Sequence, residues 1–313
     1  MRLLEPGTVV CEGVTKVYGG KVRAVDSVSF DLPSRGIFSL IGRNGAGKTT
    51  LVRILATELE PTSGRASIKG MDVMRDAKRL RERVAIVPQE ARAISWMTPR
   101  QTVASYLLWR GYGYGEAKEM ADESLGRLGL EQFANRLNGS LSGGTKRKVL
   151  VATVLASEAD IIFLDEPTTG LDPVSRRELW GTLKQLGSER FTFLTTHYLE
   201  EAEQLAEQIG ILRDGRLAAL GTLAELRSKT EYQYSVRIPP GVPVGVSEGE
   251  ASTAEDGSTQ VLLHEEDAFK VSKRLLDEGV RFSISPVSLD DIFLGLSRQI
   301  EEEVGRGDEE EEN

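Results

Sequence analysis

The sequence holds one cysteine, two histidines and no long apolar run, and each shortage excludes a class of protein. Cys11 stands alone among 313 residues, so the chain can form neither an internal disulfide nor a cysteine-ligated zinc site. His197 and His264 are too few for a multi-histidine metal centre. No apolar stretch approaches the ~18 residues of a membrane helix, and residues 1–8 lack the apolar segment of a signal peptide. These features predict a protein of the reducing cytoplasm that does not cross a membrane by itself.

Acidic residues outnumber basic ones, 48 to 39, but the excess is concentrated at one end of the chain. Residues 301–313 carry eight acids and one basic residue, Arg306, which accounts for −7 of the net charge of −9. The rest of the chain is close to neutral, so its charge argues neither for nor against a nucleic-acid partner. We expect residues 299–313 to form a solvated, disordered acidic tail.

Strands and helices are predicted to alternate through most of the chain. After two β-rich segments at 9–14 and 25–32, short apolar runs predict buried strands at 37–41, 84–87, 161–164, 191–195 and 209–212. Helices are predicted between and after them at 49–58, 116–128, 146–156, 173–186 and 199–207. This alternation predicts an α/β fold with a largely parallel sheet flanked by helices.

The composition changes near Lys229, which predicts a second, smaller domain. Strands are expected at 233–238, 260–263 and 281–284, and a helix at 267–278. Residues 239–257 are rich in Pro, Gly, Ser and acids and are expected to form a loop. We therefore predict a small α+β domain over 231–298, after a larger domain over 8–228.

A glycine-rich segment between a predicted strand and a predicted helix matches the phosphate-binding loop. Glycines let consecutive backbone N–H groups point at phosphate oxygens, and the following helix adds its positive end. Lys48 supplies a mobile charge for the outer phosphates, and the Thr49 hydroxyl can bind Mg²⁺. The nucleotide-binding residues predicted here are Gly42, Arg43, Asn44, Gly45, Ala46, Gly47, Lys48, Thr49 and Thr50.

Two carboxylates follow the predicted strand at 161–164. Ligands bind outside the carboxyl ends of parallel strands, so Asp165 and Glu166 are expected beside the phosphates. Asp165 is placed to hold Mg²⁺, and Glu166 to orient or deprotonate the attacking water. On their own they could be an ordinary pair of acids at a strand end, but the phosphate loop favours the functional interpretation.

The chain here resembles the ATP-binding subunits of ATP-binding-cassette (ABC) transporters, over about residues 8–225. The most specific element is the signature Leu-Ser-Gly-Gly at 141–144, whose Ser142 lies 23 residues before Asp165. The resemblance implies a phosphate-loop ATPase core with an added antiparallel β part and a helical subdomain at about 95–145. It also implies that Ser142, Gly143 and Gly144 bind ATP.

Three further residues take their expected roles from the same resemblance. His197, 31 residues beyond Glu166, resembles the switch histidine that contacts the γ-phosphate. Gln89, after a predicted strand, resembles the glutamine that senses Mg²⁺ and the attacking water. Tyr18 resembles the aromatic residue that stacks on adenine. An aromatic residue before a turn often belongs to the core, but the resemblance favours the stacking role for Tyr18.

The resemblance also implies partners. Two nucleotide-binding subunits, identical or paired, would pack head to tail, with ATP held between the phosphate loop of one and the signature of the other. A separate integral membrane permease subunit would be energised, placing the chain at the inner face of the cell membrane. No nucleic-acid partner is expected. Apolar residues within 95–114 form either the docking surface for that subunit or the core of the helical subdomain.

The direction of transport is predicted from the end of the second domain. Residues 286–294 resemble the Pro-x-Leu-Glu-Asp-x-Phe-Leu ending of subunits that serve drug, antibiotic and polysaccharide exporters, with Asp290 in place of the glutamate. The alternative is a soluble ABC ATPase acting on ribosomes or DNA. It is disfavoured because the chain has one cassette, and because the 117 residues between Lys48 and Asp165 leave no room for a long coiled coil.

Overall fold

The computed structural model describes residues 8–33, 35–243, 249–253 and 257–293, in two compact units. The first unit is Met1–Leu220 and the second Gly221–Asn313. The acidic tail predicted at 299–313 and the last residue of the export-type ending, Leu294, lie outside the described residues. The domain bounds given above, 8–228 and 231–298, stay predictions.

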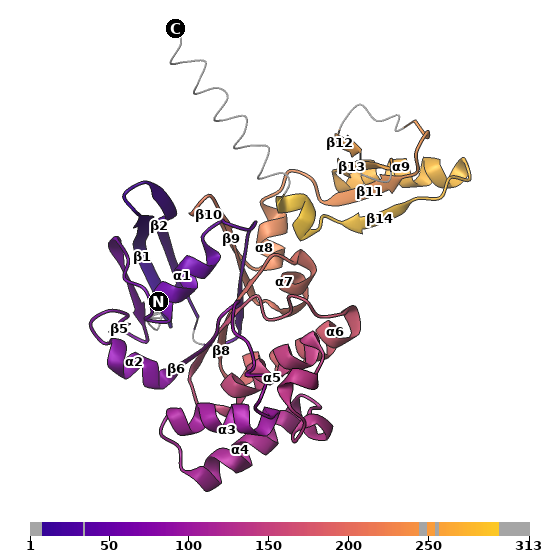
Figure 1. Ribbon diagram of the computed structural model, residues 1–313. Helices are drawn as coiled ribbons and strands as arrows, with labels where there is room; N and C mark the ends of the chain where they lie inside the picture. The colour runs from indigo at the N-terminus through magenta and orange to yellow at the C-terminus, as the bar shows by residue number, and fades with distance from the viewer. Residues whose placement is uncertain (1–7, 34, 244–248, 254–256, 294–313) are drawn as a thin grey trace. The chain divides into compact units, whose positions relative to one another are not determined.

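A six-stranded sheet organises the first unit, in the order β10-β9-β3-β8-β7-β6 (Figure 1). Its strands are β3 (Ile37–Ile41), β6 (Val84–Val87), β7 (Ile161–Asp165), β8 (Phe191–Thr196), β9 (Gln208–Arg213) and β10 (Arg216–Gly221). The five strands from β9 to β6 are parallel. The predicted parallel α/β sheet is thus confirmed, and the strand predicted at 209–212 is β9. The sequence analysis missed β10, which joins β9 in a hairpin around Asp214 and Gly215, both left-handed.

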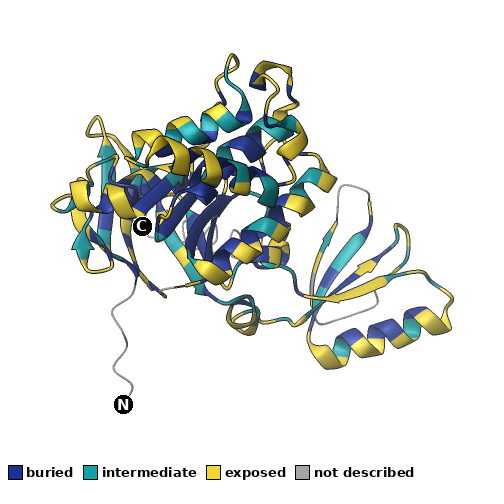
Figure 2. Ribbon diagram, turned by 90° about the horizontal axis from the view of Figure 1, so that it is seen from below, coloured by how far each residue is buried: buried dark blue, intermediate teal, exposed yellow. Residues whose placement is uncertain are grey.

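The central strands are buried on both faces, as Figure 2 shows by their dark blue colour. In β7, Ile161 and Phe163 pack toward one face, and Ile162 and Leu164 belong to the core on the other. A strand buried on both sides has an uninterrupted apolar sequence, which is why these strands could be located from the sequence.

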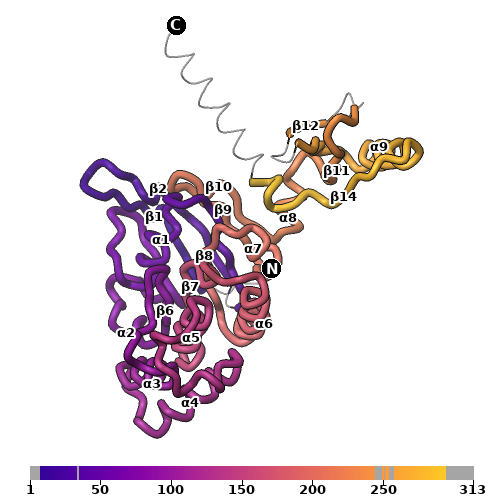
Figure 3. The backbone as a smooth tube through the Cα atoms, turned by 45° about the vertical axis from the view of Figure 1, so that its right-hand side comes forward, coloured from indigo at the N-terminus to yellow at the C-terminus, as the bar shows by residue number. Residues whose placement is uncertain are grey.

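An antiparallel sheet, β2-β1-β4-β5, packs with helix α1 (Lys48–Leu55) on one side of the parallel sheet (Figure 3). It contains β1 (Val9–Tyr18), β2 (Val22–Leu32), β4 (Ser63–Ile68) and β5 (Met71–Asp72). The sequence analysis missed β4, β5 and the short helix α2 (Ala77–Arg83). In β4 only Ala66 and Ile68 are buried, and in α2 only Leu80, so their apolar patterns are weak.

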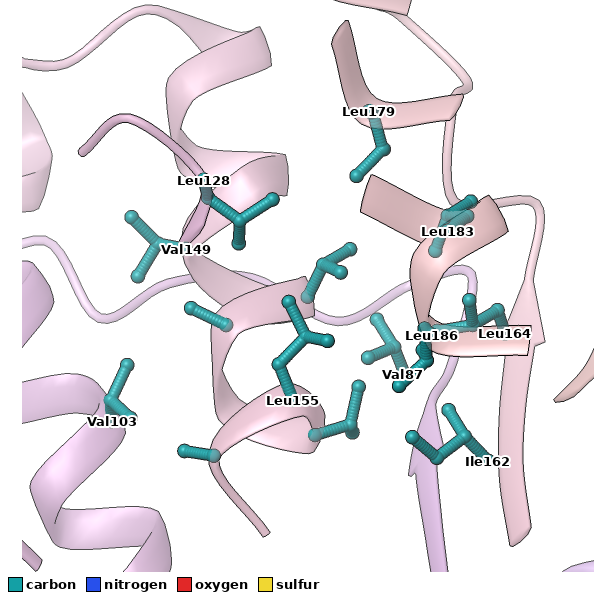
Figure 4. Packing of buried hydrophobic residues seen from close by; sticks show 14 of the residues in the cluster. Val87, Val103, Leu128, Val149, Leu155, Ile162, Leu164, Leu179, Leu183 and Leu186 are labelled. Carbon is teal, nitrogen blue, oxygen red and sulfur yellow. The ribbon is translucent and has the colours of Figure 1, made fainter. Parts of the chain in front are cut away.

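Helices lie on the other side of the parallel sheet, and the first of them, between residues 95 and 145, make up the predicted helical subdomain. The helices are α3 (Pro99–Trp109), α4 (Tyr114–Arg127), α5 (Gly143–Ala156), α6 (Pro173–Glu189) and α7 (Leu199–Leu205), with short 3₁₀ turns at Glu131–Phe133 and Asn138–Ser140. Figure 4 shows part of the core that these helices share with the sheet: Leu155 of α5 lies on one side of Val87, and Ile162 and Leu186 lie on the other. This packing fixes α5 against the strands that carry the site.

The second unit contains α8 (Leu223–Ser228) and an antiparallel sheet, β12-β13-β11-β14, covered on one face by α9 (Glu265–Asp277). The strands are β11 (Tyr234–Ile238), β12 (Glu250–Thr253), β13 (Thr259–Leu263) and β14 (Ser283–Pro286). The predicted α+β character is therefore found. The expectation of a loop throughout 239–257 is wrong at β12, an edge strand whose Glu-Ala-Ser-Thr sequence lacks apolar alternation and which pairs through its backbone.

Candidate active site

The phosphate loop links β3 to α1 by a backbone path that only glycine can follow at two positions. Gly47 has φ +103° and precedes Lys48, the first residue of α1, and a Cβ there would lie 2.1 Å from the carbonyl oxygen of Ala24. A Cβ on Gly42 would lie 2.3 Å from the carbonyl oxygen of Leu212. The loop is thus pressed against neighbouring backbone, which fixes the direction of its N–H groups.

Lys48 is held inside this loop by its own backbone. Its ammonium group donates to the carbonyl oxygens of Gly42 at 2.8 Å and Arg43 at 3.2 Å. The same Nζ lies 3.5 Å from Oε1 of Glu166, and both side chains are only 5% exposed. The phosphate-binding cation and the candidate water-activating carboxylate are therefore in direct contact, although 118 residues separate them in the sequence.

A cavity of about 270 Å³ opens over the loop. Eight predicted site residues line it, together with Ala24: they are Asn44, Gly45, Gly47, Lys48, Thr49, Thr50, Gln89 and Glu166. Gly42 and Arg43 take part through the carbonyl groups that hold Lys48. Ala46, within the loop, is buried. The structure thus brings the phosphate loop, Gln89 and Glu166 around one space.

Glu166 lies at the centre of a cluster of polar side chains. Its Oε2 accepts from the Gln89 amide at 3.0 Å and the Thr169 hydroxyl at 3.2 Å. The Nδ1 atom of His197 lies 3.2 Å from the same oxygen, without the geometry of a hydrogen bond. Glu166 has φ +50°, a left-handed conformation that costs about 1–3 kcal/mol in a residue other than glycine. Such strain is typical of residues whose position matters for function.

Asp165 is 1% exposed and ends strand β7. Its Oδ1 accepts a hydrogen bond from the Thr195 hydroxyl on the adjacent strand β8. Thr195 also accepts from the backbone N–H of Glu166, through both its carbonyl and its hydroxyl oxygen. Mg²⁺ in phosphate sites takes one or two carboxylates together with substrate phosphates. The oxygen donors of Asp165, Thr49 and Gln89 fit that chemistry.

The signature residues lie at the start of α5 and outside the lining of the cavity. Ser142 caps the helix, because its Oγ accepts from the backbone N–H of Thr145 at 3.1 Å. The helix therefore begins at Gly143, three residues before the predicted start at 146. Ser142 and Gly143 are exposed and Gly144 is half-buried. A helix start with free N–H groups suits an anion, but within this chain it does not face the phosphate loop's cavity.

Tyr18 does not line the cavity either, nor do the predicted site residues Asp165 and His197. Tyr18 ends β1, is 40% exposed, and has the Lys16 ammonium 5.6 Å from its ring centre. The exposed ring is therefore not a core residue. An exposed ring can stack on a flat ligand, and the adenine-stacking role of Tyr18 stays a prediction.

Three side chains that shape the site were missed in the sequence analysis: Thr169, Thr195 and Arg147. Arg147 is 8% exposed and binds backbone carbonyl groups on both sides of the site. Burial lowers its pKa, and the nearby carboxylates of Asp165 and Glu166 act in the opposite direction. Contacts to backbone carbonyls leave no mark in the sequence, which explains why Arg147 drew no prediction.

This geometry combines the parts needed for phosphoryl transfer to water. It offers a phosphate loop with a fixed lysine, oxygen donors for a divalent cation, and a carboxylate aligned by amide and hydroxyl groups.

The known proteins that this chain resembles are ATP-binding proteins of the same kind. The ABC transporter family matches residues 25–169. The daunorubicin/doxorubicin resistance ATP-binding protein DrrA of Streptomyces peucetius is 34% identical over 304 residues, covering 91% of either chain. The chain belongs to the ABC transporter family.

Other relatives support this membership. The daunorubicin resistance ATP-binding protein DrrA3 of Streptomyces coeruleorubidus is 39% identical over 223 residues, covering 71% of this chain and 70% of that protein. Among solved structures, the ATP-binding cassette MJ0796, described as a dimeric post-hydrolysis state bound to ADP and Pi, superposes with a TM-score of 0.64. It is 27% identical and covers 69% of this chain and 98% of its own. The match to DrrA exceeds the length of the first unit and so extends into the second.

The chain is an ATP-binding ATPase subunit of the ABC transporter type, with the fold of that family. These relatives do not support the alternative of an ATPase acting on ribosomes or DNA. In the part of the chain that the structure describes, no helix is long and apolar enough to span a bilayer.

Proposed function

We propose that this ATPase powers export through a separate integral membrane protein, and that it binds ATP as a head-to-tail pair, either with itself or with a related subunit. Two observations support export: the resistance ATP-binding proteins among its relatives, and the exporter-like ending of the second unit. The chain would then lie at the inner face of the membrane, attached through its partner.

In the bound state, Lys48 and the loop N–H groups hold the outer phosphates, and Tyr18 stacks on adenine. Thr49, Gln89 and Asp165 hold Mg²⁺, which neutralises phosphate charge when bound. Because no group of three His, Cys, Asp or Glu side chains gathers in the described residues, we expect the cation to take its other ligands from the nucleotide and water.

Glu166 orients and deprotonates the attacking water, and His197, whose Nδ1 lies 3.2 Å from Oε2 of Glu166, contacts the γ-phosphate. Before ATP binds, Lys48 pairs with Glu166. The triphosphate must therefore draw Lys48 toward itself, which leaves the Glu166 carboxylate free to act on water. Positioning and charge stabilisation then perform the reaction without a covalent intermediate.

The observation that carries the paired arrangement is the position of the signature. Ser142 and the N–H groups of Gly143 and Gly144 start an α-helix and are accessible, yet they do not line the cavity over Lys48. A second subunit, turned head to tail, would place its own signature opposite this cavity. Each ATP then joins two chains, and hydrolysis separates them.

The helical subdomain offers a surface for the membrane protein. Trp96 is 74% exposed and Trp109 is 84% exposed, near the start and at the end of its first helical segment. Large aromatic side chains left in solvent are typical of protein contacts. We propose that these two residues belong to the docking surface for the permease and not to the subdomain core.

One experiment tests the ATP-joined pair. The Glu166→Gln variant should bind ATP without turning it over and elute as a dimer in size-exclusion chromatography with ATP and Mg²⁺, but as a monomer without ATP. The Lys48→Ala, Glu166→Gln double variant is the control and should stay monomeric. A monomer in every condition would contradict the shared site.

A second experiment tests the membrane partner. Tagged wild-type chain should be recovered from detergent-solubilised membranes together with one integral membrane protein. Replacing Trp96 and Trp109 by Ser should return the chain to the soluble fraction while ATP binding is unchanged. A wild-type pool that is soluble and bound to ribosomes would contradict the proposal.

A further inference from the structure

Arg147 is buried in α5 and bonded to backbone on both sides of the catalytic cluster. Its Nη2 donates to the carbonyl oxygens of Asp165 at 2.7 Å and Glu166 at 2.9 Å. Nε donates to Pro167 at 3.2 Å. Nη1 donates to Pro88 at 3.3 Å and Gln89 at 3.2 Å. One side chain thus joins the segment that carries Glu166 to the segment that carries Gln89.

These contacts use the full hydrogen-bonding capacity of arginine. A guanidinium group has five N–H donors in a fixed plane, and here five carbonyl oxygens accept from them. Lysine has three donors on one atom and cannot reach the same spread of acceptors. Burying a charged group costs free energy, and the five carbonyl dipoles around the guanidinium offset that cost.

Arg147 also belongs to the helix that begins at the signature. Ser142 caps that helix, and Arg147 lies in its second turn. The backbone of Glu166 next to Arg147 is in the strained left-handed conformation, and the Gln89 side chain donates to Glu166 Oε2. A shift of the start of α5 would therefore move Arg147 and, with it, the backbone carbonyl groups of Glu166 and Gln89 that Arg147 holds.

We propose that Arg147 is a positioning residue that couples the signature end of α5 to Glu166 and Gln89, so that ATP docking on the signature sets the carboxylate that activates water. The inference rests on the proposed function, in which Ser142 meets the ATP of a second subunit. Arg147 is not among the residues that line the cavity over the phosphate loop. It acts through the two backbone segments that it holds.

The test compares Arg147→Lys and Arg147→Gln with wild type in the full chain, by steady-state ATPase rates and by titration with a fluorescent ATP analogue. The expected kcat falls by about 10–100-fold, since small misplacement of a catalytic group costs up to about 100-fold. The KM for ATP and the affinity of the monomer should stay within about threefold, because Arg147 does not touch the phosphate loop. Arg147→Lys, which keeps the charge, guards against a variant that fails to fold.

Lys148→Gln is the matched control. Lys148 is as buried as Arg147 and next to it on α5, but its Nζ contacts Glu178 of α6 at 2.5 Å. Its removal should lower the melting temperature without lowering kcat more than about threefold. Both sets of rates are measured well below the melting temperature of the least stable variant.

A double-mutant cycle separates positioning from general stability. If Arg147 acts through Gln89 and Glu166, the Arg147→Lys change should slow a Gln89→Ala variant at least threefold less than it slows wild type. An equal effect in both backgrounds would overturn the inference. So would an unchanged kcat in a folded Arg147 variant, or a KM that rises as much as kcat falls.

Failure of this inference is distinguishable from failure of the proposed function. If Glu166→Gln does not dimerise with ATP, the shared site is wrong whatever Arg147 does. If Glu166→Gln dimerises and the Arg147 variants keep the wild-type kcat, only the coupling by Arg147 is wrong.

Discussion

The contact between Lys48 and Glu166 makes a prediction about ATP affinity. In the nucleotide-free chain the two charges lie 3.5 Å apart and are almost fully buried. At an effective dielectric constant of about 20, their attraction is about 5 kcal/mol. Binding of a triphosphate must weaken that attraction, because Lys48 turns to the phosphates. Glu166 therefore opposes ATP binding, both by holding Lys48 and by repelling the incoming negative charge.

Glu166→Gln removes the charge but keeps the shape of the side chain. Much of the 5 kcal/mol is offset by the hydration that the charges lose and by the carbonyl contacts of Lys48, so we expect about a third to appear in binding. That is ~1.5 kcal/mol, or roughly tenfold tighter binding. The variant should thus bind ATP more tightly in addition to hydrolysing it at least about 100-fold more slowly.

The assay is a fluorescence titration with a non-hydrolysable ATP analogue, at protein concentrations where the chain is monomeric. Glu178→Gln is the control, because Glu178 also pairs with a buried lysine, Lys148, at 2.5 Å but lies away from the phosphate loop. It should leave the dissociation constant unchanged. An affinity of Glu166→Gln equal to or weaker than that of wild type would refute the competition for Lys48.

Three further predictions concern single side chains. Lys48→Ala should weaken ATP binding at least about 100-fold in calorimetry, and unchanged affinity would contradict the loop assignment. Tyr18→Ala should weaken binding about tenfold while Tyr18→Trp does not, since a stacked base is worth roughly 1–3 kcal/mol; equal affinities would exclude stacking. Burial raises the pKa of Glu201, whose Oε1 accepts a hydrogen bond from the Trp180 indole at 3.0 Å. The protonated Glu201 side chain therefore contributes to the stability of the fold at low pH, and this contribution is lost as the pH rises through that pKa. Glu201→Gln should thus raise the melting temperature by roughly 2–4 °C at pH 8, ~1 kcal/mol, and by less at pH 5; the opposite trend in differential scanning calorimetry would show that Glu201 folds in its charged form.

The parallel sheet could be predicted because the residues next to its strands mark where each strand ends. Strand β3 ends at Ile41, before Gly42, and β6 ends at Val87, before Pro88, and both match the predicted ranges. Helix α6 begins with Pro173 at its first position, after the capping residue Asp172. Apolar runs and capping residues are local features, and one sequence suffices to locate them.

Elements without such features were missed. Strand β12 is held by pairing with β13, and α2 buries a single leucine. Both depend on neighbours that are distant in sequence. The predicted start of α5 was three residues late because the signature itself supplies the cap, through Ser142 and Thr145.

Most of the residues that line the cavity were predicted from the sequence, but their contacts were not. The phosphate loop and the two acids of β7 follow known spacing. Two sets of contacts form only when β3, β6 and β7 lie together in one sheet. They are the pairing of Lys48 with Glu166 and the hydrogen bonds from Arg147 to five carbonyl groups. Every residue has a backbone carbonyl group, so a sequence pattern cannot show which of these groups accepts a hydrogen bond.

The most direct test of the shared site is a cross-link between two differently tagged chains, one carrying Ser142→Cys and the other Asn44→Cys, both in the Glu166→Gln background. Cys11 is buried, which raises the pKa of its thiol and keeps it unreactive, and Cys11→Ser removes it altogether. A short bifunctional maleimide should join the two tags with ATP and Mg²⁺ and leave them separate without nucleotide. A yield of mixed-tag product that does not depend on ATP, or no such product at all, would contradict the account.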